Sequence, residues 1–212
     1  MKLIDLTVEK FMNEVDSNSP APGGGSVSAL ISTLGISLAR MVGHLSVTKK
    51  KFLKLDQDIQ HQFNAYLEHL ETIKNELIDL IDQDTEAFNK IMKAYQIPKE
   101  DIPRRTDAIE AATLEAINVP YKVSTISLKA LEMLSFILAY GNKQTVSDLG
   151  VSALSLATGI EGAALNVLIN LPGLSDEDQK SIYKNEMMTI IKQSTELKQS
   201  ILNLVYEKIE QK

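Results

Sequence analysis

Apolar residues recur at steps of three and four along almost the whole chain, a spacing that predicts amphipathic α-helices. No run of β-branched residues alternates with polar residues between turn residues, so strands are not expected. No linker, repeat or low-complexity tract interrupts the pattern. The chain is therefore expected to form one all-α domain over residues 1–212, a helical bundle with long, kinked helices.

The first elements are separated by a turn rich in Pro and Gly. Apolar positions predict a short helix from about residue 6 to residue 15. The turn at residues 20–26, Pro-Ala-Pro-Gly-Gly-Gly-Ser, follows it. Ser26 is expected to be the N-cap of a second helix that reaches about Leu45, because its hydroxyl can accept from an unpaired N–H of the first turn.

The next stretch is unusually long. Residues 49–96 contain neither Gly nor Pro, and their apolar residues keep the helical spacing. One helix over this stretch would measure about 70 Å at ~1.5 Å per residue. A compact domain of this size is shorter, so the helix is expected to bend or to project into a partner. Pro98 is expected to end it.

Three further helices are expected. One starts near Pro103 and reaches Tyr140, with a break or kink at Pro120. After a C-cap turn at Gly141, a helix rich in small residues covers 147–170, where close packing on several sides would bury it. Residues 175–178 resemble a capping box that starts the last helix.

Composition limits the function classes. Hydrophobic residues make up 44% of the chain but aromatic residues only 5%, which predicts an aliphatic core. The net charge of −6 argues against nucleic acid or an anionic membrane as a partner. Cys is absent, which removes disulfides and thiolate chemistry and fits a cytoplasmic location. The most apolar stretches, 27–39 and 149–171, are interpreted as core helices and not as membrane spans.

The glycine turn is the first candidate for chemistry. Gly23, Gly24 and Gly25 expose a run of backbone N–H groups before a helix, and such groups can cradle an anion or the edge of a planar ligand. The alternative is a tight loop that lets two helices meet. No strand precedes the turn, so nucleotide binding is disfavoured.

Acidic residues form the second candidate. Asp82 and Glu86 share one face of the long helix, while Asp84 points elsewhere. A solvated stripe is the commoner role for such residues. Buried neighbours on either side would instead make these carboxylates general acids or bases. Asp148, near the start of a later helix, either caps that helix or faces a ligand.

Amides form the third candidate. Asn166 and Asn170 lie four residues apart on the most apolar helix, where unpartnered amides would be costly. Either another helix or a polar ligand must satisfy them. The three histidines, His44, His61 and His69, are scattered without metal-ligand spacing, so no metal site is expected.

Taken together and in order, these segments resemble the cyclodeaminase/cyclohydrolase family, the all-helical domain of bifunctional formiminotransferase-cyclodeaminases that also occurs alone. The resemblance covers nearly the whole chain. The segments that carry it are 19–26 (SPAPGGGS), 41–43 (MVG), 82–88 (DQDTEAF), 97–99 (IPK), 141–149 (GNKQTVSDL) and 166–171 (NVLINL).

The resemblance implies a tetrahydrofolate derivative as the substrate, a homodimer with its site near the subunit interface, and no metal. It implies the closure of 5-formiminotetrahydrofolate to 5,10-methenyltetrahydrofolate with release of ammonia, in histidine degradation. On this hypothesis Asp82, Asp84 and Asp148 supply the catalytic carboxylates. The folate would contact the glycine turn with Ser26, the amides Asn142, Asn166 and Asn170, and the lysines Lys49, Lys50 and Lys99 at its glutamate tail.

Two alternatives stay open at this stage. Within the family, a methenyltetrahydrofolate cyclohydrolase would hydrolyse the methenyl bridge to 10-formyltetrahydrofolate. Outside it, a non-catalytic helical scaffold would dimerise and bind no small molecule. Its acidic residues would then be ordinary surface groups.

Overall fold

The computed structural model describes residues 2–211. Six α-helices account for most of that range, and no strand occurs in it: α1 (Val8–Val15), α2 (Gly24–Val47), α3 (Gln57–Tyr95), α4 (Ile102–Tyr140), α5 (Val146–Asn170) and α6 (Glu177–Glu210). Four short 3-10 turns link them: η1 (Leu3–Asp5), η2 (Phe52–Lys54), η3 (Lys143–Thr145) and η4 (Leu171–Gly173). The expected all-α bundle is confirmed.

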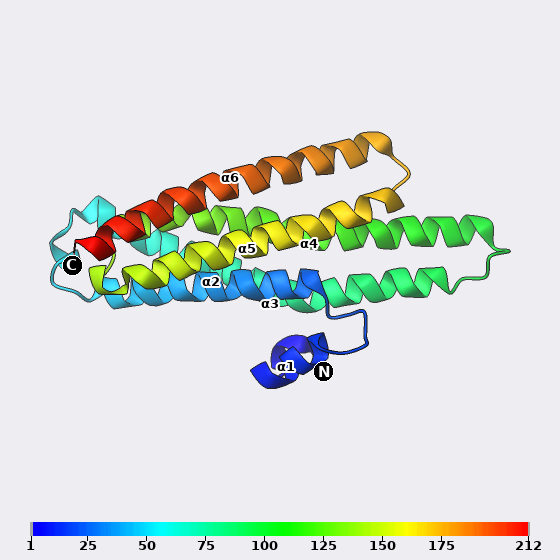
Figure 1. The fold of residues 1–212 in the computed structure, drawn as a ribbon, viewed down its shortest axis with the longest axis horizontal. Coiled ribbons are helices and arrows are strands. Elements are labelled where there is room, and N and C mark those ends of the chain that lie inside the picture. The colour runs from blue at the N-terminus through cyan, green and yellow to red at the C-terminus, as the bar shows by residue number, and fades with distance from the viewer. Residues whose placement is uncertain (1, 212) are drawn as a thin grey trace.

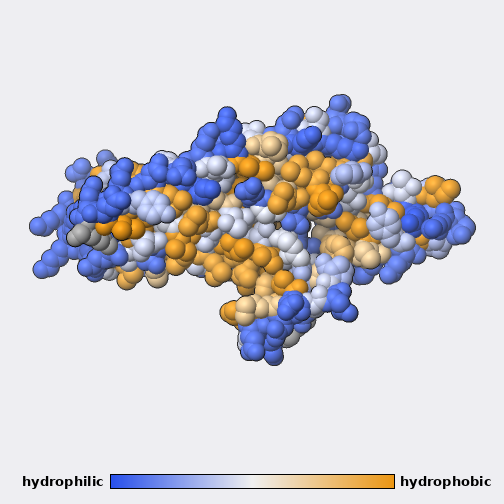
Figure 2. Space-filling view, in the orientation of Figure 1, coloured by the Kyte–Doolittle hydropathy of each residue, from blue (hydrophilic) through white to orange (hydrophobic). Residues whose placement is uncertain are grey.

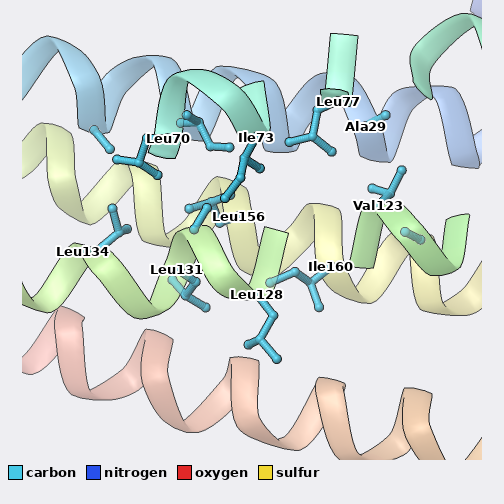
Figure 3. Close-up of a cluster of buried hydrophobic side chains, with 14 of the residues drawn as sticks. Ala29, Leu70, Ile73, Leu77, Val123, Leu128, Leu131, Leu134, Leu156 and Ile160 are labelled. Carbon is cyan, nitrogen blue, oxygen red and sulfur yellow. The ribbon is translucent and has the colours of Figure 1, made fainter. Parts of the chain in front are cut away.

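The long helices lie side by side in an elongated bundle, and α1 lies off its flank (Figure 1). The hairpin of α3 and α4 extends past the ends of the other helices. Aliphatic side chains from α2 to α5 fill the centre, among them Leu77, Leu131 and Leu156 (Figure 3). Bulky aliphatic residues therefore make the core, as the low aromatic content predicts.

Helix α5 is central because small residues let its neighbours approach. A Cβ at Gly159 would lie 2.1 Å from Ser32 Oγ of α2, which is inside van der Waals contact. Ser152 Oγ donates to the Gly35 carbonyl of α2 at 2.6 Å, and Ser124 Oγ of α4 donates to the Ile160 carbonyl at 3.0 Å. The expectation that this helix is packed closely on several sides is correct.

Two expectations about the long helices are wrong. Helix α3 begins only at Gln57, because Leu55 and Asp56 are extended and the chain before them forms η2, which buries Phe52. No Gly or Pro marks this interruption. Helix α4 continues through Pro120, so the break considered there does not occur, since packing on both sides outweighs the loss of one helical hydrogen bond; a kink at Pro120 stays a prediction.

The start of α2 also differs from the expectation. Gly23 is the N-cap, and Ser26 lies inside the first turn with its side chain fully buried. The capping box expected at residues 175–178 does not form: Asp176 is the N-cap of α6 and accepts from the N–H groups of Asp178 and Gln179, while Ser175 bonds to Glu110.

Three segments are long and apolar enough, by length and composition alone, to cross a membrane: Gly24–Val47, Ile102–Tyr140 and Lys143–Gly173. Within the most apolar window of each, 56%, 61% and 50% respectively is buried inside the bundle. Packing against other helices therefore accounts for about half of this apolar character.

Candidate functional site

The first turn of α2 meets the C-terminal half of α3 through a partly buried carboxylate. Asp84 Oδ2 accepts from the Ser26 N–H at 2.8 Å and lies 3.1 Å from Ser26 Oγ. Ser26 Oγ also lies 2.8 Å from the Ile81 carbonyl, which its hydrogen can reach. Asp84 thus satisfies an orphan N–H at the positive end of α2, as a capping residue would, although it belongs to another helix.

Gly25 makes this contact possible. A Cβ at Gly25 would lie 2.0 Å from Asp84 Oδ1, so any side chain there would displace the carboxylate. The glycine turn therefore has both of the roles considered for it. It lets two helices meet, and it brings one backbone N–H, that of Ser26, to an anion, which is a carboxylate of the chain itself.

Opposing effects act on the acidity of Asp84. Burial disfavours the charged form and raises the pKa of the carboxyl, while the hydrogen bonds from the Ser26 hydroxyl and N–H lower it. Burial is the larger effect, so the net shift is upward from 3.8. A carboxyl with a raised pKa can hold a proton closer to neutral pH, which suits a general acid.

The two amides of α5 face the same region. Asn166 Nδ2 donates to the Gly162 carbonyl at 2.8 Å, and Asn170 Nδ2 donates to the Asn166 carbonyl at 2.9 Å. Because a carbonyl only accepts, these bonds identify Nδ2 as the atom facing each carbonyl, and Asn170 Nδ2 also lies 3.5 Å from the Ala116 carbonyl of α4. The Oδ1 atoms have no partner among the described residues, so each can accept from a ligand.

A cavity of about 310 Å³ joins these groups. It lies between the start of α2, the C-terminal half of α3, the Pro120 region of α4 and the end of α5. We call it the Asp84 cavity. Its lining residues are Pro20, Ala21, Gly23, Gly24, Asp84, Phe88, Ile91, Ala116, Asn166, Ile169 and Asn170.

The structure separates Asp82 from this cavity. Asp82 Oδ1 accepts from the Leu3 N–H, and Oδ2 is buried without a partner among the described residues. The two aspartates therefore face different neighbours, as their spacing on a helix requires. Asp82 anchors the N-terminal segment and does not line the Asp84 cavity, so its catalytic role stays a prediction.

A second cavity, of about 360 Å³, lies at the opposite end of α2. Its lining includes three exposed lysines, so we call it the lysine cavity. The Asn142 N–H donates to Ser46 Oγ at 2.7 Å and fixes the turn at its edge. The lining residues are Ser46, Lys49, Lys51, Phe52, Tyr140, Gly141, Asn142, Lys143 and Gln144.

Several predicted site residues lie away from the Asp84 cavity. Asp148 is in the first turn of α5, 18 residues before Asn166 and so about 27 Å along the helix at ~1.5 Å per residue. Neither Ser147 nor Asp148 caps α5, because its N-cap is Thr145. Lys50 and Lys99 are exposed, and neither lines either cavity. Ser26 is buried, so it positions Asp84 and does not contact a ligand directly.

The structure adds lining residues that the sequence analysis missed. Lys51 and Lys143 accompany Lys49 in the lysine cavity, and Ala116 lines the Asp84 cavity. The sequence offered a hint only for Lys143, because it directly follows the candidate residue Asn142 in the predicted turn. No group of three or more His, Cys, Asp or Glu side chains within residues 2–211 could hold a metal ion.

Comparisons with known proteins show the family and the fold. The sequence profile of the family described as "Formiminotransferase-cyclodeaminase" matches residues 7–189. A methenyltetrahydrofolate cyclohydrolase from Methylorubrum extorquens is 31% identical over 206 residues, covering 96% of this chain and 97% of the relative. A formimidoyltransferase-cyclodeaminase from Dictyostelium discoideum is 38% identical over 203 residues, and there the chain covers only 37% of the relative.

A solved structure has the same fold. The crystal structure of a formiminotetrahydrofolate cyclodeaminase from Thermotoga maritima aligns with a TM-score of 0.78 at 27% identity. The alignment covers 97% of this chain and 96% of the other. The likeness therefore extends over the whole bundle.

Proposed function

Because the chain belongs to the formiminotransferase-cyclodeaminase family, we propose that it is a formiminotetrahydrofolate cyclodeaminase. The observation that carries the proposal is the Asp84 cavity. There a carboxyl with a raised pKa and two amides with free oxygens lie on one cavity of about 310 Å³, within the range of small-molecule sites.

The reaction needs two proton movements. N10 of 5-formiminotetrahydrofolate attacks the formimino carbon, and a tetrahedral carbon forms between N5 and N10. The departing nitrogen carries one hydrogen and must gain two more to leave as ammonia. One of these comes from N10 and the other from an acid. The products are ammonia and the 5,10-methenyl cation.

Asp84 is the residue suited to this task. Its raised pKa lets it hold the proton that the departing nitrogen needs, and its carboxylate would stabilise the cationic amidine and the cationic product. Ser26 holds Oδ2, while Oδ1 has no hydrogen bond among the described residues and is available to the substrate. Ser26 and Gly25 are positioning residues for this carboxyl.

Asn166 and Asn170 would orient the substrate. Their Oδ1 atoms accept hydrogen bonds, and a reduced pterin ring presents several N–H donors. Phe88 and Ile91 supply apolar surface on the α3 side of the cavity. A cavity with apolar walls and a few fixed acceptors suits a flat, donor-rich ring.

The lysine cavity suits the carboxylates of the glutamate tail, because Lys49, Lys51 and Lys143 give it positive charge. In one chain it lies far from the Asp84 cavity. Gly24 and Ser46 are 22 residues apart on α2, about 33 Å at ~1.5 Å per residue. That span exceeds a folate with one glutamate, so we propose that the tail at these lysines belongs to a folate whose pterin is bound by a second copy of the chain.

An exposed apolar surface supports a homodimer with the site near the interface. It runs along α2 and α5, and we call it the α2/α5 face (Figure 2). A second copy packed antiparallel on this face would bring the lysine cavity of one chain beside the Asp84 cavity of the other. Its exposed apolar residues are Leu34, Met41, Leu45, Val151, Leu154, Leu165 and Ile169.

A methenyltetrahydrofolate cyclohydrolase is the second candidate. The Methylorubrum extorquens relative with that name matches this chain over nearly its full length. Hydrolysis passes through a similar tetrahedral carbon, with water as the nucleophile. The same carboxyl could then activate the water.

One assay separates these candidates. The purified protein is incubated with 5-formiminotetrahydrofolate, and methenyl absorbance and ammonia are followed together. A cyclodeaminase forms both in equal amounts. A cyclohydrolase instead consumes 5,10-methenyltetrahydrofolate faster than buffer does and releases no ammonia from the formimino substrate. A scaffold does neither and shows no thermal shift with a reduced folate, whereas a ligand at 100 times its Kd would add about 2.7 kcal/mol of stability.

A further inference from the structure

Pro120 alters the backbone of α4 at the wall of the Asp84 cavity. A proline inside a helix has no N–H to donate to the carbonyl four residues earlier, and its ring pushes that carbonyl aside. In α4 this carbonyl belongs to Ala116, which lines the cavity. The wall therefore carries a backbone acceptor without its helical partner.

The chain replaces that partner only weakly. Asn170 Nδ2 lies 3.5 Å from the Ala116 carbonyl oxygen, at the outer limit for a hydrogen bond. The same nitrogen is closer to the Asn166 carbonyl, at 2.9 Å. Ala116 is only 8% exposed, so its carbonyl has little contact with bulk solvent outside the cavity. A nearly buried acceptor with one long hydrogen bond gains free energy when a ligand donates to it.

The acceptors around the cavity indicate the ligand chemistry. The Ala116 carbonyl, the Oδ1 atoms of Asn166 and Asn170, and Asp84 all accept, so the cavity is complementary to a ring edge that carries hydrogen-bond donors. The exocyclic amino group of a pterin projects beyond its ring and carries two hydrogens. It is therefore the donor that reaches a recessed carbonyl most easily.

We propose that the Ala116 carbonyl, released by Pro120, accepts a hydrogen bond from the exocyclic 2-amino group of the bound pterin. Pro120 is then a specificity-determining residue that acts through the backbone without touching the ligand. The inference rests on the proposed function, because it takes a reduced folate as the ligand.

Two variants in α4 test this inference. Pro120→Val restores the N–H with a side chain of similar volume, so the Ala116 carbonyl regains its helical partner. Pro120→Ala restores it with a better helix former, in case Val packs poorly. Pro103→Ala is the matched control, because Pro103 lies at the start of α4, where a missing N–H leaves no helical carbonyl without a donor. Circular dichroism and thermal unfolding check each fold.

The readout is discrimination between two ligands, tetrahydrofolate and its 2-desamino-2-methyl analogue. Wild type and Pro103→Ala are expected to bind tetrahydrofolate about 2- to 12-fold more tightly than the analogue, the effect of one hydrogen bond. Both Pro120 variants should lose most of this preference. If folded Pro120 variants still prefer tetrahydrofolate over the analogue as strongly as wild type does, the inference about the Ala116 carbonyl is wrong, while the proposed function stands. Failure of wild type to bind tetrahydrofolate contradicts the proposed function as well.

Discussion

The two ends of α2 differ in how they hold charge. At the N-terminal end, Asp84 is partly buried, accepts from the Ser26 N–H, lies 3.1 Å from Ser26 Oγ and packs against Gly25. At the C-terminal end, Lys49 and Lys51 are exposed on an irregular turn. The first charge is held by Ser26 and has a shifted pKa, while the lysine side chains are exposed to solvent.

This difference between the two ends of α2 suggests that they have separate tasks. A reacting group must be held within a fraction of an ångström of its partner, because misplacement by about 1 Å can cost about 10²-fold in rate. Charges that only attract a flexible tail need no such precision. The buried end is therefore suited to chemistry, and the exposed end to binding. Substitutions at each end of α2 test whether chemistry and binding are separated in this way.

The largest effect is expected from a pair of substitutions two residues apart on α3. Asp84→Asn removes the proposed acid and should lower kcat by about 10²–10⁴-fold. Asp82→Asn should leave kcat within a few-fold of wild type, because Asp82 faces Leu3 and not the cavity. Steady-state assays of both variants check this. Similar losses of kcat in the two variants would show that Asp82 and Asp84 do not differ in their roles.

A matched pair of glycine substitutions tests the fixed geometry. Gly25→Ala places a methyl group where Asp84 Oδ1 lies and should lower kcat by about 10²-fold through misplacement of the carboxyl. Gly23→Ala meets only the Pro20 carbonyl at 3.5 Å, an ordinary contact, and should be tolerated. Kinetics and thermal unfolding of both variants provide the measurement.

A double variant strengthens that test. If the Gly25→Ala methyl group clashes with Asp84, its cost in unfolding free energy should shrink when Asp84→Ala is also present. Additive costs would show that the clash is not the cause.

A smaller effect is expected at the lysine cavity. An exposed ion pair contributes about 0.2–1 kcal/mol, so each of Lys49→Gln, Lys51→Gln and Lys143→Gln should raise KM about 1.4- to 5-fold with little change in kcat. Added salt should weaken wild-type binding in the same way. Lys99→Gln is the control and should change nothing. A fall in kcat without a change in KM would assign these lysines to the chemistry instead.

The smallest effect concerns stability and pH. Because the folded pKa of Asp84 is raised, the folded protein keeps a proton that the unfolded chain has released once pH exceeds 3.8. Wild type should therefore lose stability relative to Asp84→Asn as pH rises from that value through the raised pKa, with no further change above it. Denaturant titrations across this range measure the difference. A relative gain in wild-type stability would show that the Ser26 hydrogen bonds outweigh burial.

The sequence predicts the fold better than the site. Periodic apolar residues locate the helices, and the run of small residues identifies the packed helix α5, because both signals are local. The start of α3 at Gln57 is missed. The chain before it leaves the helix in order to bury Phe52, and no Gly or Pro marks that change in the sequence. The continuity of α4 through Pro120 is also a tertiary effect.

Within the site, the sequence identifies Asp84, Asn166 and Asn170 as candidates but cannot group them. Asp82 and Asp84 look equivalent until their neighbours are known. Their spacing places them on different faces of α3, but it does not reveal which face packs against α2. Asp148 and Asn166 belong to the same helix but lie 18 residues apart, which separates them by about 27 Å at ~1.5 Å per residue. The role of Ser26 as a partner of Asp84 depends on a contact across 58 residues of chain.

The most direct test of the account is a crystal structure of this protein with 5-formyltetrahydrofolate, a stable analogue of the formimino substrate. The account predicts that the pterin ring occupies the Asp84 cavity, with its N5 substituent beside the Asp84 carboxyl and its donor edge on Asn166, Asn170 and the Ala116 carbonyl. A pterin ring bound elsewhere, with the Asp84 cavity empty, would contradict it.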